Sequence, residues 1–292
     1  MKEKNKIFTA LILVLVLFLL AGIGAFKPKL VSGESGNKKI RKLGGVECRM
    51  PENSALVFFG STFGVNLTSY KAYKDFDEAL FSLKAGKVDA IWACDVSADY
   101  LIKTNENLVK SDYTDMSDIQ KTADPRFSFG MALKKDSGEA LRDEINIALK
   151  SMKSDGTLDS IIDRYVTGAE VFETEEGKKN RFYLDMMKKA SGNGTVTVGI
   201  SGAVPPLELL DEDGDPYGFC VAMMEEVGLR TGKKVKFVRL DNETAFTQLL
   251  SGRVDVIFSY GTGRITTEYK QKFIVTDGYL DMQRYEMLQI NK

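Results

Sequence analysis

The sequence predicts an α/β protein with two similar lobes and mainly parallel sheets. Three observations support this prediction: an internal repeat, a helix followed by a strand in both copies, and further strands and helices that alternate around each copy. Strands that alternate with helices pair in parallel, because each helix carries the chain back across one face of the sheet.

The chain begins with a targeting segment. The uncharged run from Ile7 to Phe26 follows three lysines and is long enough to cross a bilayer core of about 30 Å. We interpret residues 1–26 as either a signal peptide or a transmembrane anchor, and residues 27–42 as a flexible tether. The folded part is therefore expected outside the cytoplasm, with the N-terminal segment contacting the membrane.

The repeat covers residues 79–92 and 245–258, with equivalent positions 166 residues apart. Each copy has an apolar helical face, a glycine and a short apolar strand. Gly86 and Gly252 predict left-handed helix ends, because glycine adopts a positive φ at little steric cost.

Further elements surround each copy. Strands are predicted at residues 45–50 and 195–201, and each leads through a loop to a helix. The helices are expected from the capping residues near Ser54 to Gly64, and from Phe219 to Thr231. Between the two halves, residues 137–166 have the apolar spacing of two helices broken at Asp155-Gly156. Residues 167–193 are polar and are interpreted as an interlobe linker, with a helix-compatible stretch at Phe182–Met187.

Composition excludes several functions. There are 40 basic and 41 acidic residues, so no broad basic field is available to hold nucleic acid. The chain contains no histidine, which excludes imidazole catalysis and histidine-ligated metals. Its three cysteines have no CxxC spacing, so we predict neither a zinc knuckle nor a disulfide framework. No metal site and no cofactor are predicted.

Several spaced motifs resemble one known family. From Gly194, the run GTVTVGISGAVPPLELLDEDGDPYGFCVAMMEEVGLRTGKKVKFVRLDNETAFTQLLSGRVDVIF is similar to the first lobe of extracytoplasmic solute-binding proteins of the amino-acid-binding type. These are family 3 of the bacterial solute-binding proteins, with the periplasmic binding protein type II fold. Residues 43–166 resemble the second lobe and closing helices through AGKVDAIWACD, FSFGMALKK and LRDEINIALKSMKSDGTLDSIIDRYV. The resemblance implies a two-lobed clamshell.

The order of the lobes is reversed relative to that family. The resemblance implies a second-lobe-like domain at 43–134, closing helices at 135–166, the linker at 167–193 and a first-lobe-like domain at 194–292. A circular permutation explains this order, because a linker can join termini that lie on the same lobe. An exchange of half-domains between two chains would use the same contacts.

The resemblance also implies polar ligand contacts. Asp95, at the end of a strand, matches the acidic residue that meets a ligand ammonium group, although it is also placed to cap the next helix. Ser259 and Thr262 match hydroxyl positions of the family, or serve only as loop hydrogen-bonding groups. Arg264 is expected to hold a ligand carboxylate, although it lies three residues before the family's arginine position, and a solvated loop arginine is an equal alternative.

Four other residues are candidates for the same site. Leu207 replaces the usual stacking aromatic residue, and Tyr217 and Tyr260 are candidates to wall the cleft. Ser54, at a helix N-terminus, is a candidate anion donor, with ordinary capping as the alternative.

We therefore expect a non-enzymatic binding protein that captures a small polar solute, such as an amino acid, for the membrane permease of an ABC-type importer. Two alternatives remain. One is a membrane-anchored ligand sensor, and the other is a dehydratase-like enzyme on the same fold, with Glu208 or Asp95 as its general acid.

Overall fold

The computed structural model describes residues 40–46, 52–63, 65–111, 128–183, 194–241, 244–261, 271–282 and 285–291. The chain divides between Trp92 and Ala93 into two compact units. The predicted targeting segment lies outside the described residues. Within the described ranges, no helix is long and apolar enough to cross a membrane.

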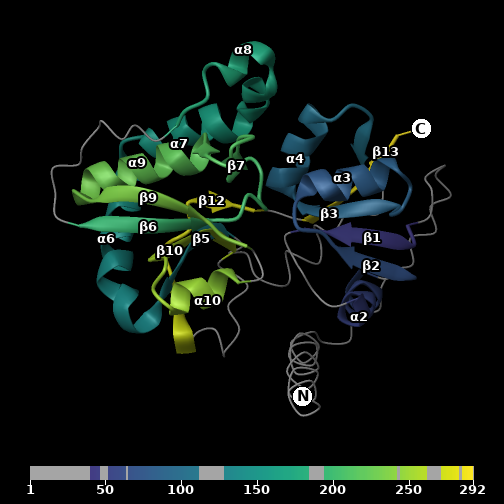
Figure 1. Ribbon diagram of the computed structural model, residues 1–292, viewed down its shortest axis with the longest axis horizontal. Helices are drawn as coiled ribbons and strands as arrows, with labels where there is room; N and C mark the ends of the chain where they lie inside the picture. Colours follow the sequence, from purple (N-terminus) through teal and green to yellow (C-terminus); the bar gives the residue numbers. More distant parts are fainter. Residues whose placement is uncertain are drawn as a thin grey trace. The chain divides into compact units, whose positions relative to one another are not determined.

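The first sheet has five strands in the order β2-β1-β3-β13-β4 (Figure 1). Strand β1 is parallel to both β2 and β3, and β13 is antiparallel to β4. The strands are β1 (Lys42–Gly45), β2 (Ser69–Ala72), β3 (Ala90–Cys94), β4 (Leu108–Lys110) and β13 (Tyr285–Ile290). Helices α2 (Glu52–Phe63), α3 (Phe76–Lys84) and α4 (Asp95–Thr104) lie between them in the sequence.

Strand β1 lies earlier than the strand predicted at 45–50, and residues 47–50 are outside the described ranges. Glycines are suited to β1 because two tyrosines pack tightly against it. A Cβ atom on Gly44 would meet the Tyr73 ring, and one on Gly45 would meet the Tyr70 hydroxyl.

The second sheet has the order β11-β5-β10-β6-β9, with β12 (Leu280–Asp281) also paired to β5. Strand β6 is parallel to β9 and β10, whereas β5 is antiparallel to β10 and β11. The strands are β5 (Ser128–Lys134), β6 (Thr195–Ile200), β9 (Lys234–Arg239), β10 (Val256–Gly261) and β11 (Phe273–Val275). Strands β7 (Leu209–Leu210) and β8 (Pro216–Tyr217) form a separate small hairpin.

The two sheets share one strand order. In the first sheet β1 lies between β2, at one edge, and β3, and in the second sheet β6 lies in the same way between β9, at one edge, and β10. A strand from a distant part of the sequence then separates β3 from β4, and β10 from β11. That strand is β13 in the first sheet and β5 in the second. These sheets confirm the predicted α/β class, but both are mixed and together not mainly parallel, because β13 and β5 come from distant parts of the chain and pair antiparallel with β4 and with β10 and β11.

The sequence repeat is also a repeat in geometry. Helices α3 and α10 (Ala245–Leu250) are followed by Gly86 and Gly252, with φ of 70° and 76°. After these glycines, the Lys87 N–H donates to the Ser82 carbonyl at 2.9 Å, and the Arg253 N–H donates to the Gln248 carbonyl at 3.0 Å. The predicted left-handed helix ends are therefore confirmed.

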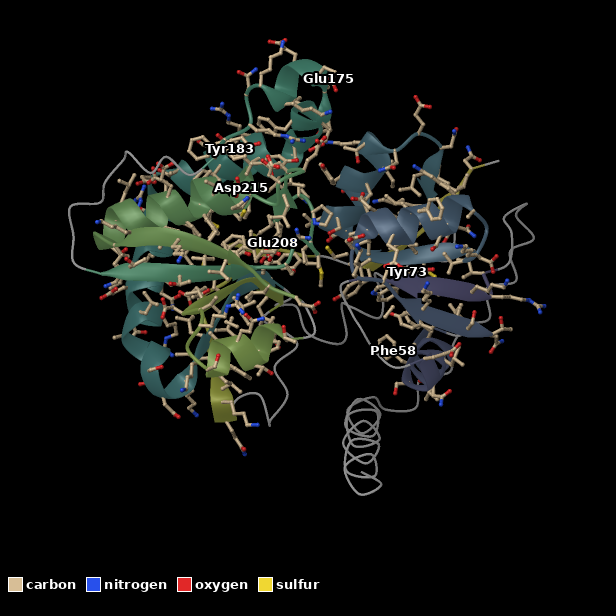
Figure 2. The ribbon with its side chains drawn as sticks, viewed as in Figure 1. Phe58, Tyr73, Glu175, Tyr183, Glu208 and Asp215 are labelled. Carbon is tan, nitrogen blue, oxygen red and sulfur yellow. The ribbon has the colours of Figure 1, made fainter. Side chains whose placement is uncertain are left out.

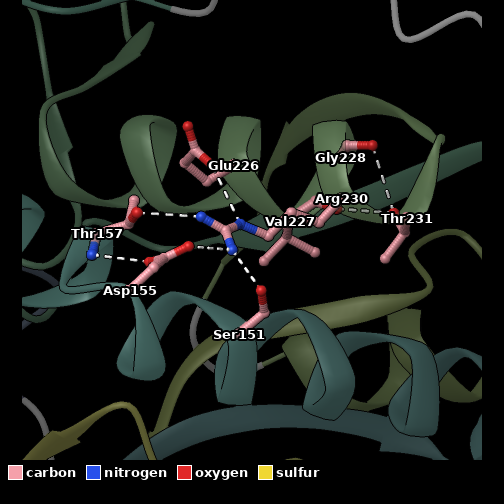
Figure 3. Close-up of polar contacts among 8 residues, drawn as sticks. All are labelled: Ser151, Asp155, Thr157, Glu226, Val227, Gly228, Arg230 and Thr231. Atoms are coloured by element: carbon pink, nitrogen blue, oxygen red, sulfur yellow. Dashed lines mark hydrogen bonds and ion pairs between the residues drawn. The ribbon is translucent and has the colours of Figure 1, made fainter.

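Three helices pack together beside the second sheet. They are α6 (Lys135–Ser154), α7 (Thr157–Ile162) and α9 (Phe219–Thr231), and both α6 and α7 contact α9. The predicted break at Asp155-Gly156 is observed, with Gly156 at a φ of 78°. Arg230 of α9 links the break to its own helix: it donates to Ser151 Oγ at 2.6 Å, Asp155 Oδ2 at 2.8 Å and Thr157 Oγ1 at 3.0 Å (Figure 3).

Part of the predicted linker has regular structure. After α7 the chain forms η2 (Asp163–Thr167), η3 (Ala169–Glu173) and α8 (Glu175–Lys178). In the stretch predicted as helix-compatible at Phe182–Met187, Tyr183 makes a β-bridge to Tyr217, and residues 184–187 lie outside the described ranges.

Candidate functional site

A buried polar cluster lies where β6 and β10 end. The two strands are parallel neighbours, so their carboxyl ends reach the same edge of the sheet. Ser201 follows β6 directly, Ser259 lies within the end of β10, and Glu208 lies in the loop after β6 (Figure 2). Ligands of open α/β sheets bind at such carboxyl ends, which makes this edge the candidate site.

Glu208 holds the loop that leaves β6. Its Oε2 atom accepts hydrogen bonds from the Ser201 N–H at 2.7 Å, the Gly202 N–H at 2.9 Å and the Ser201 hydroxyl at 3.0 Å. The residue is 3% exposed. Burial raises the pKa of Glu208, and the hydrogen bonds from Ser201 and Gly202 oppose that rise.

Ser259 connects Glu208 to a third segment. Its side chain hydrogen-bonds Glu208, and its Oγ accepts from the Tyr279 hydroxyl at 3.2 Å. Ser259 has a φ of 51°, unusual for a residue other than glycine, and the pairing of β10 with β5 shifts register between Ile257 and Tyr260. A strained conformation held by surrounding contacts is typical of functional positions.

Asp95 is the first residue of α4 and is half-buried. Its Oδ1 atom accepts from the adjacent Val96 N–H at 2.9 Å. The N-cap contact of this helix is instead made by Cys94, whose Sγ accepts from the Ser97 N–H at 3.5 Å. The ligand role of Asp95 stays a prediction.

The other predicted site residues have varied surroundings. Leu207 is 0% exposed, and the half-buried Tyr260 packs edge-on against Phe246 with ring centroids 5.4 Å apart. Ser54 is half-buried in the first turn of α2. Thr262 and Arg264 lie outside the described residues. Their ligand roles also stay predictions.

Tyr217 is engaged within the protein. It is 2% exposed, and its hydroxyl donates to Glu173 Oε1 at 2.6 Å. Arg181 lies over its ring, 4.2 Å from the centroid. Sequence reasoning missed both partners, because each lies in the segment interpreted as a linker.

Sequence reasoning assigned Glu208 only as a possible general acid. A carboxylate within an apolar run, PPLELL, was a signal for a buried and hydrogen-bonded side chain. Among the residues that the structure describes, no group of three or more Cys, Asp or Glu side chains is placed to hold a metal ion.

The family comparison covers this cluster. Residues 196–289 match the model of the bacterial extracellular solute-binding proteins, family 3. The matched segment contains Glu208, Ser259 and Tyr279, so the buried cluster lies in the part of the chain that resembles extracellular solute-binding proteins. The resemblance identified from the sequence is thereby confirmed for this segment.

The solved structures that the chain resembles share little sequence with it. The BvgS VFT2 domain of Bordetella pertussis is 10% identical, with 87% of this chain and 82% of that chain covered and a TM-score of 0.41. An ancestral arginine-binding protein is 16% identical, with coverage of 87% and 86% and a TM-score of 0.36. The L-cystine solute receptor of Neisseria gonorrhoeae is 29% identical, but coverage is 30% and 36% and the TM-score is 0.25. No curated protein matches the chain.

Proposed function

We propose that this protein binds a small polar solute, an amino acid or a related metabolite, outside the cytoplasm and delivers it to the permease of an ABC-type importer. The observation that carries the proposal is the family match of residues 196–289, which contains the buried cluster at the ends of β6 and β10. Members of this family are binding proteins, so the proposed role requires no catalytic group.

The proposed ligand contacts follow the charges of an amino acid. Asp95 receives the ammonium group, Arg264 the carboxylate, and Ser259 and Thr262 donate or accept through their hydroxyls. The Glu208 contacts support this proposal, because they hold Ser201 and Ser259 in place before any solute arrives. A preformed site loses less conformational entropy on binding.

We further propose that the chain is a circular permutation of the family order. Two observations support this. The family-matching segment comes last in the chain, and β5 and α6, which precede it, pack with its strand β10 and helix α9. An exchange between two chains predicts a dimer, whereas a permutation permits a monomer, so light scattering after size-exclusion chromatography separates the two.

The proposed location also has a direct test. Ile7–Phe26 is proposed to direct the chain across the membrane, as a signal peptide or an anchor. Protease added to intact, wall-stripped cells should digest the folded part. Full protection, together with cytosolic fractionation, would contradict the proposal.

The function is tested by thermal shift of the purified chain with the L-amino acids one at a time, and with neutral sugars as the control series. A solute that binds only the folded state at 100 times its Kd adds about 2.7 kcal/mol to the free energy of unfolding. The proposal expects a raised midpoint with at least one amino acid, and recovery of that amino acid unchanged. Equal midpoints throughout, or chemical conversion of the bound compound, would overturn it.

A further inference from the structure

Residues 163–183, which we call the strap, contact helix α4. The Lys103 ammonium group of α4 donates to the Thr167 carbonyl at 2.7 Å and pairs with Glu170 at 3.3 Å. Helix α4 also contacts both η2 and η3. The strap is therefore packed on α4 along several residues.

The other end of the strap contacts the β7-β8 hairpin and the start of α9. The Gly218 N–H donates to the Phe182 carbonyl at 2.9 Å, and Tyr183 forms a β-bridge with Tyr217. Tyr183 also hydrogen-bonds Asp211 through its side chain. Tyr183 and Glu175 mark the strap in Figure 2.

Glu173 joins the two sets of contacts. Its Oε1 atom accepts from the Tyr217 hydroxyl at 2.6 Å, its Oε2 atom accepts from Arg181 at 3.0 Å, and its side chain hydrogen-bonds Tyr100 of α4. Arg181 is fixed in turn by the Phe172 carbonyl at 3.2 Å. Burial raises the pKa of both Tyr100 and Tyr217, so each phenol stays a neutral donor.

We propose that Glu173 is a positioning residue that fixes α4 to the β7-β8 hairpin, and so sets the place of Asp95. Asp95 and Tyr100 lie on one ten-residue helix, so an anchor at Tyr100 restrains the position of the helix start. Tyr217, in β8, then anchors the strap and is not part of the solute site. Only the consequence for Asp95 rests on the proposed function; the strap contacts require no solute.

Hydrogen exchange of the unliganded full chain tests the proposal. Glu173→Ala should speed amide exchange about tenfold in both residues 97–104 and 211–218, while β6 and β10 exchange as in the wild type. Glu176→Ala is the matched control, because Glu176 lies on the same strap, is 81% exposed and pairs with Lys179 three residues later. Its exchange should be unchanged throughout. Unchanged exchange in α4 of Glu173→Ala, or equal acceleration in every segment, would overturn the proposal.

Two milder variants keep the test valid if Glu173→Ala fails to fold. Tyr100→Phe should loosen residues 97–104 alone, and Tyr217→Phe should loosen residues 211–218 alone, because each removes one hydroxyl from Glu173. Faster amide exchange in every segment of both variants would contradict a positioning role. If exchange in α4 is faster in Glu173→Ala but no amino acid binds, the positioning role of Glu173 is supported and the proposed function is wrong. If an amino acid binds but exchange in α4 is unchanged, the proposed function is supported and the positioning role is wrong.

Discussion

Asp89 and Asp255 make the same contact in the two sheets. The Asp89 N–H donates to the Lys42 carbonyl at 2.8 Å, and the Asp255 N–H donates to the Thr197 carbonyl at 2.8 Å. Each carboxylate accepts a hydrogen bond back from that same residue, from the Lys42 N–H at 3.0 Å and from the Thr197 N–H at 2.8 Å. The repeated Val-Asp pair thus fixes the start of β3 to β1, and the start of β10 to β6.

Asp89→Ala and Asp255→Ala should each lower the free energy of unfolding by about 1–2 kcal/mol, because each leaves a strand N–H without its carboxylate acceptor. Urea titration followed by circular dichroism measures this change. Asp89→Asn and Asp255→Asn keep an acceptor oxygen and should cost less. An alanine variant as stable as the wild type would refute the anchoring role.

Gly86→Ala and Gly252→Ala should each destabilise the protein by about 1–2 kcal/mol through backbone strain alone. Both residues have positive φ, and a Cβ on either would have no atom within 4 Å. Gly60→Ala is the matched control, because Gly60 lies inside α2 and is equally open to a Cβ. That change should stabilise by about 0.5–1 kcal/mol. Thermal midpoints that move in the same direction for all three variants would contradict the argument.

Glu208→Gln should alter how stability depends on pH. The pKa of Glu208 is raised above its ordinary value of 4.5 by burial, so the folded protein binds the proton more tightly than the unfolded chain. The contribution of this group is therefore fully present below pH 4.5 and is lost as pH rises through the folded pKa. In Glu208→Gln, the free energy of unfolding should not show this decrease as the pH rises. Parallel stability curves for wild type and variant from pH 4 to 8 would disprove the shift.

The pKa of Asp155 should rise when Arg230 is replaced. Hydrogen bonds from the Thr157 side chain and from Arg230 lower this pKa to about 2, from 3.8 (Figure 3). The stabilising contribution of Asp155 is present above pH 3.8 and is lost as pH falls through about 2. In Arg230→Met, NMR titration of the Asp155 carboxyl should give a value nearer 3.8. Lys233→Met, which removes the cation paired with Glu144 at 3.0 Å, should leave the pKa of Asp155 unchanged.

Asp95→Ala should weaken amino-acid binding by roughly ten- to hundredfold, because the bound ammonium group would be left desolvated and without its counter-charge. Arg264→Ala should do the same through the ligand carboxylate. Asp99→Ala controls for the loss of an acidic residue from α4, since Asp99 is 62% exposed and pairs with Lys110 at 2.7 Å. Calorimetric titration measures each affinity. Equal affinities in Asp95→Ala and Asp99→Ala would remove Asp95 from the site.

Local sequence determined much of the fold. The repeat, the left-handed Gly86 and Gly252 and the helix break at Gly156 are all properties of short segments, where side-chain spacing and glycine conformation act directly on the backbone. The family resemblance was visible for the same reason, because its motifs are short runs such as SGRVD.

Long-range pairing was decided only by the tertiary structure. Nothing in the local sequence of residues 128–134 or 285–290 shows that each completes a sheet whose other strands lie elsewhere in the chain. The contacts of Glu208 and Glu173 also depend on segments that are distant in the sequence. A carboxylate is buried only where several donors converge to offset the cost of its desolvation. Those donors come from segments whose meeting depends on the packing of the whole fold, so no local pattern in the sequence specifies them.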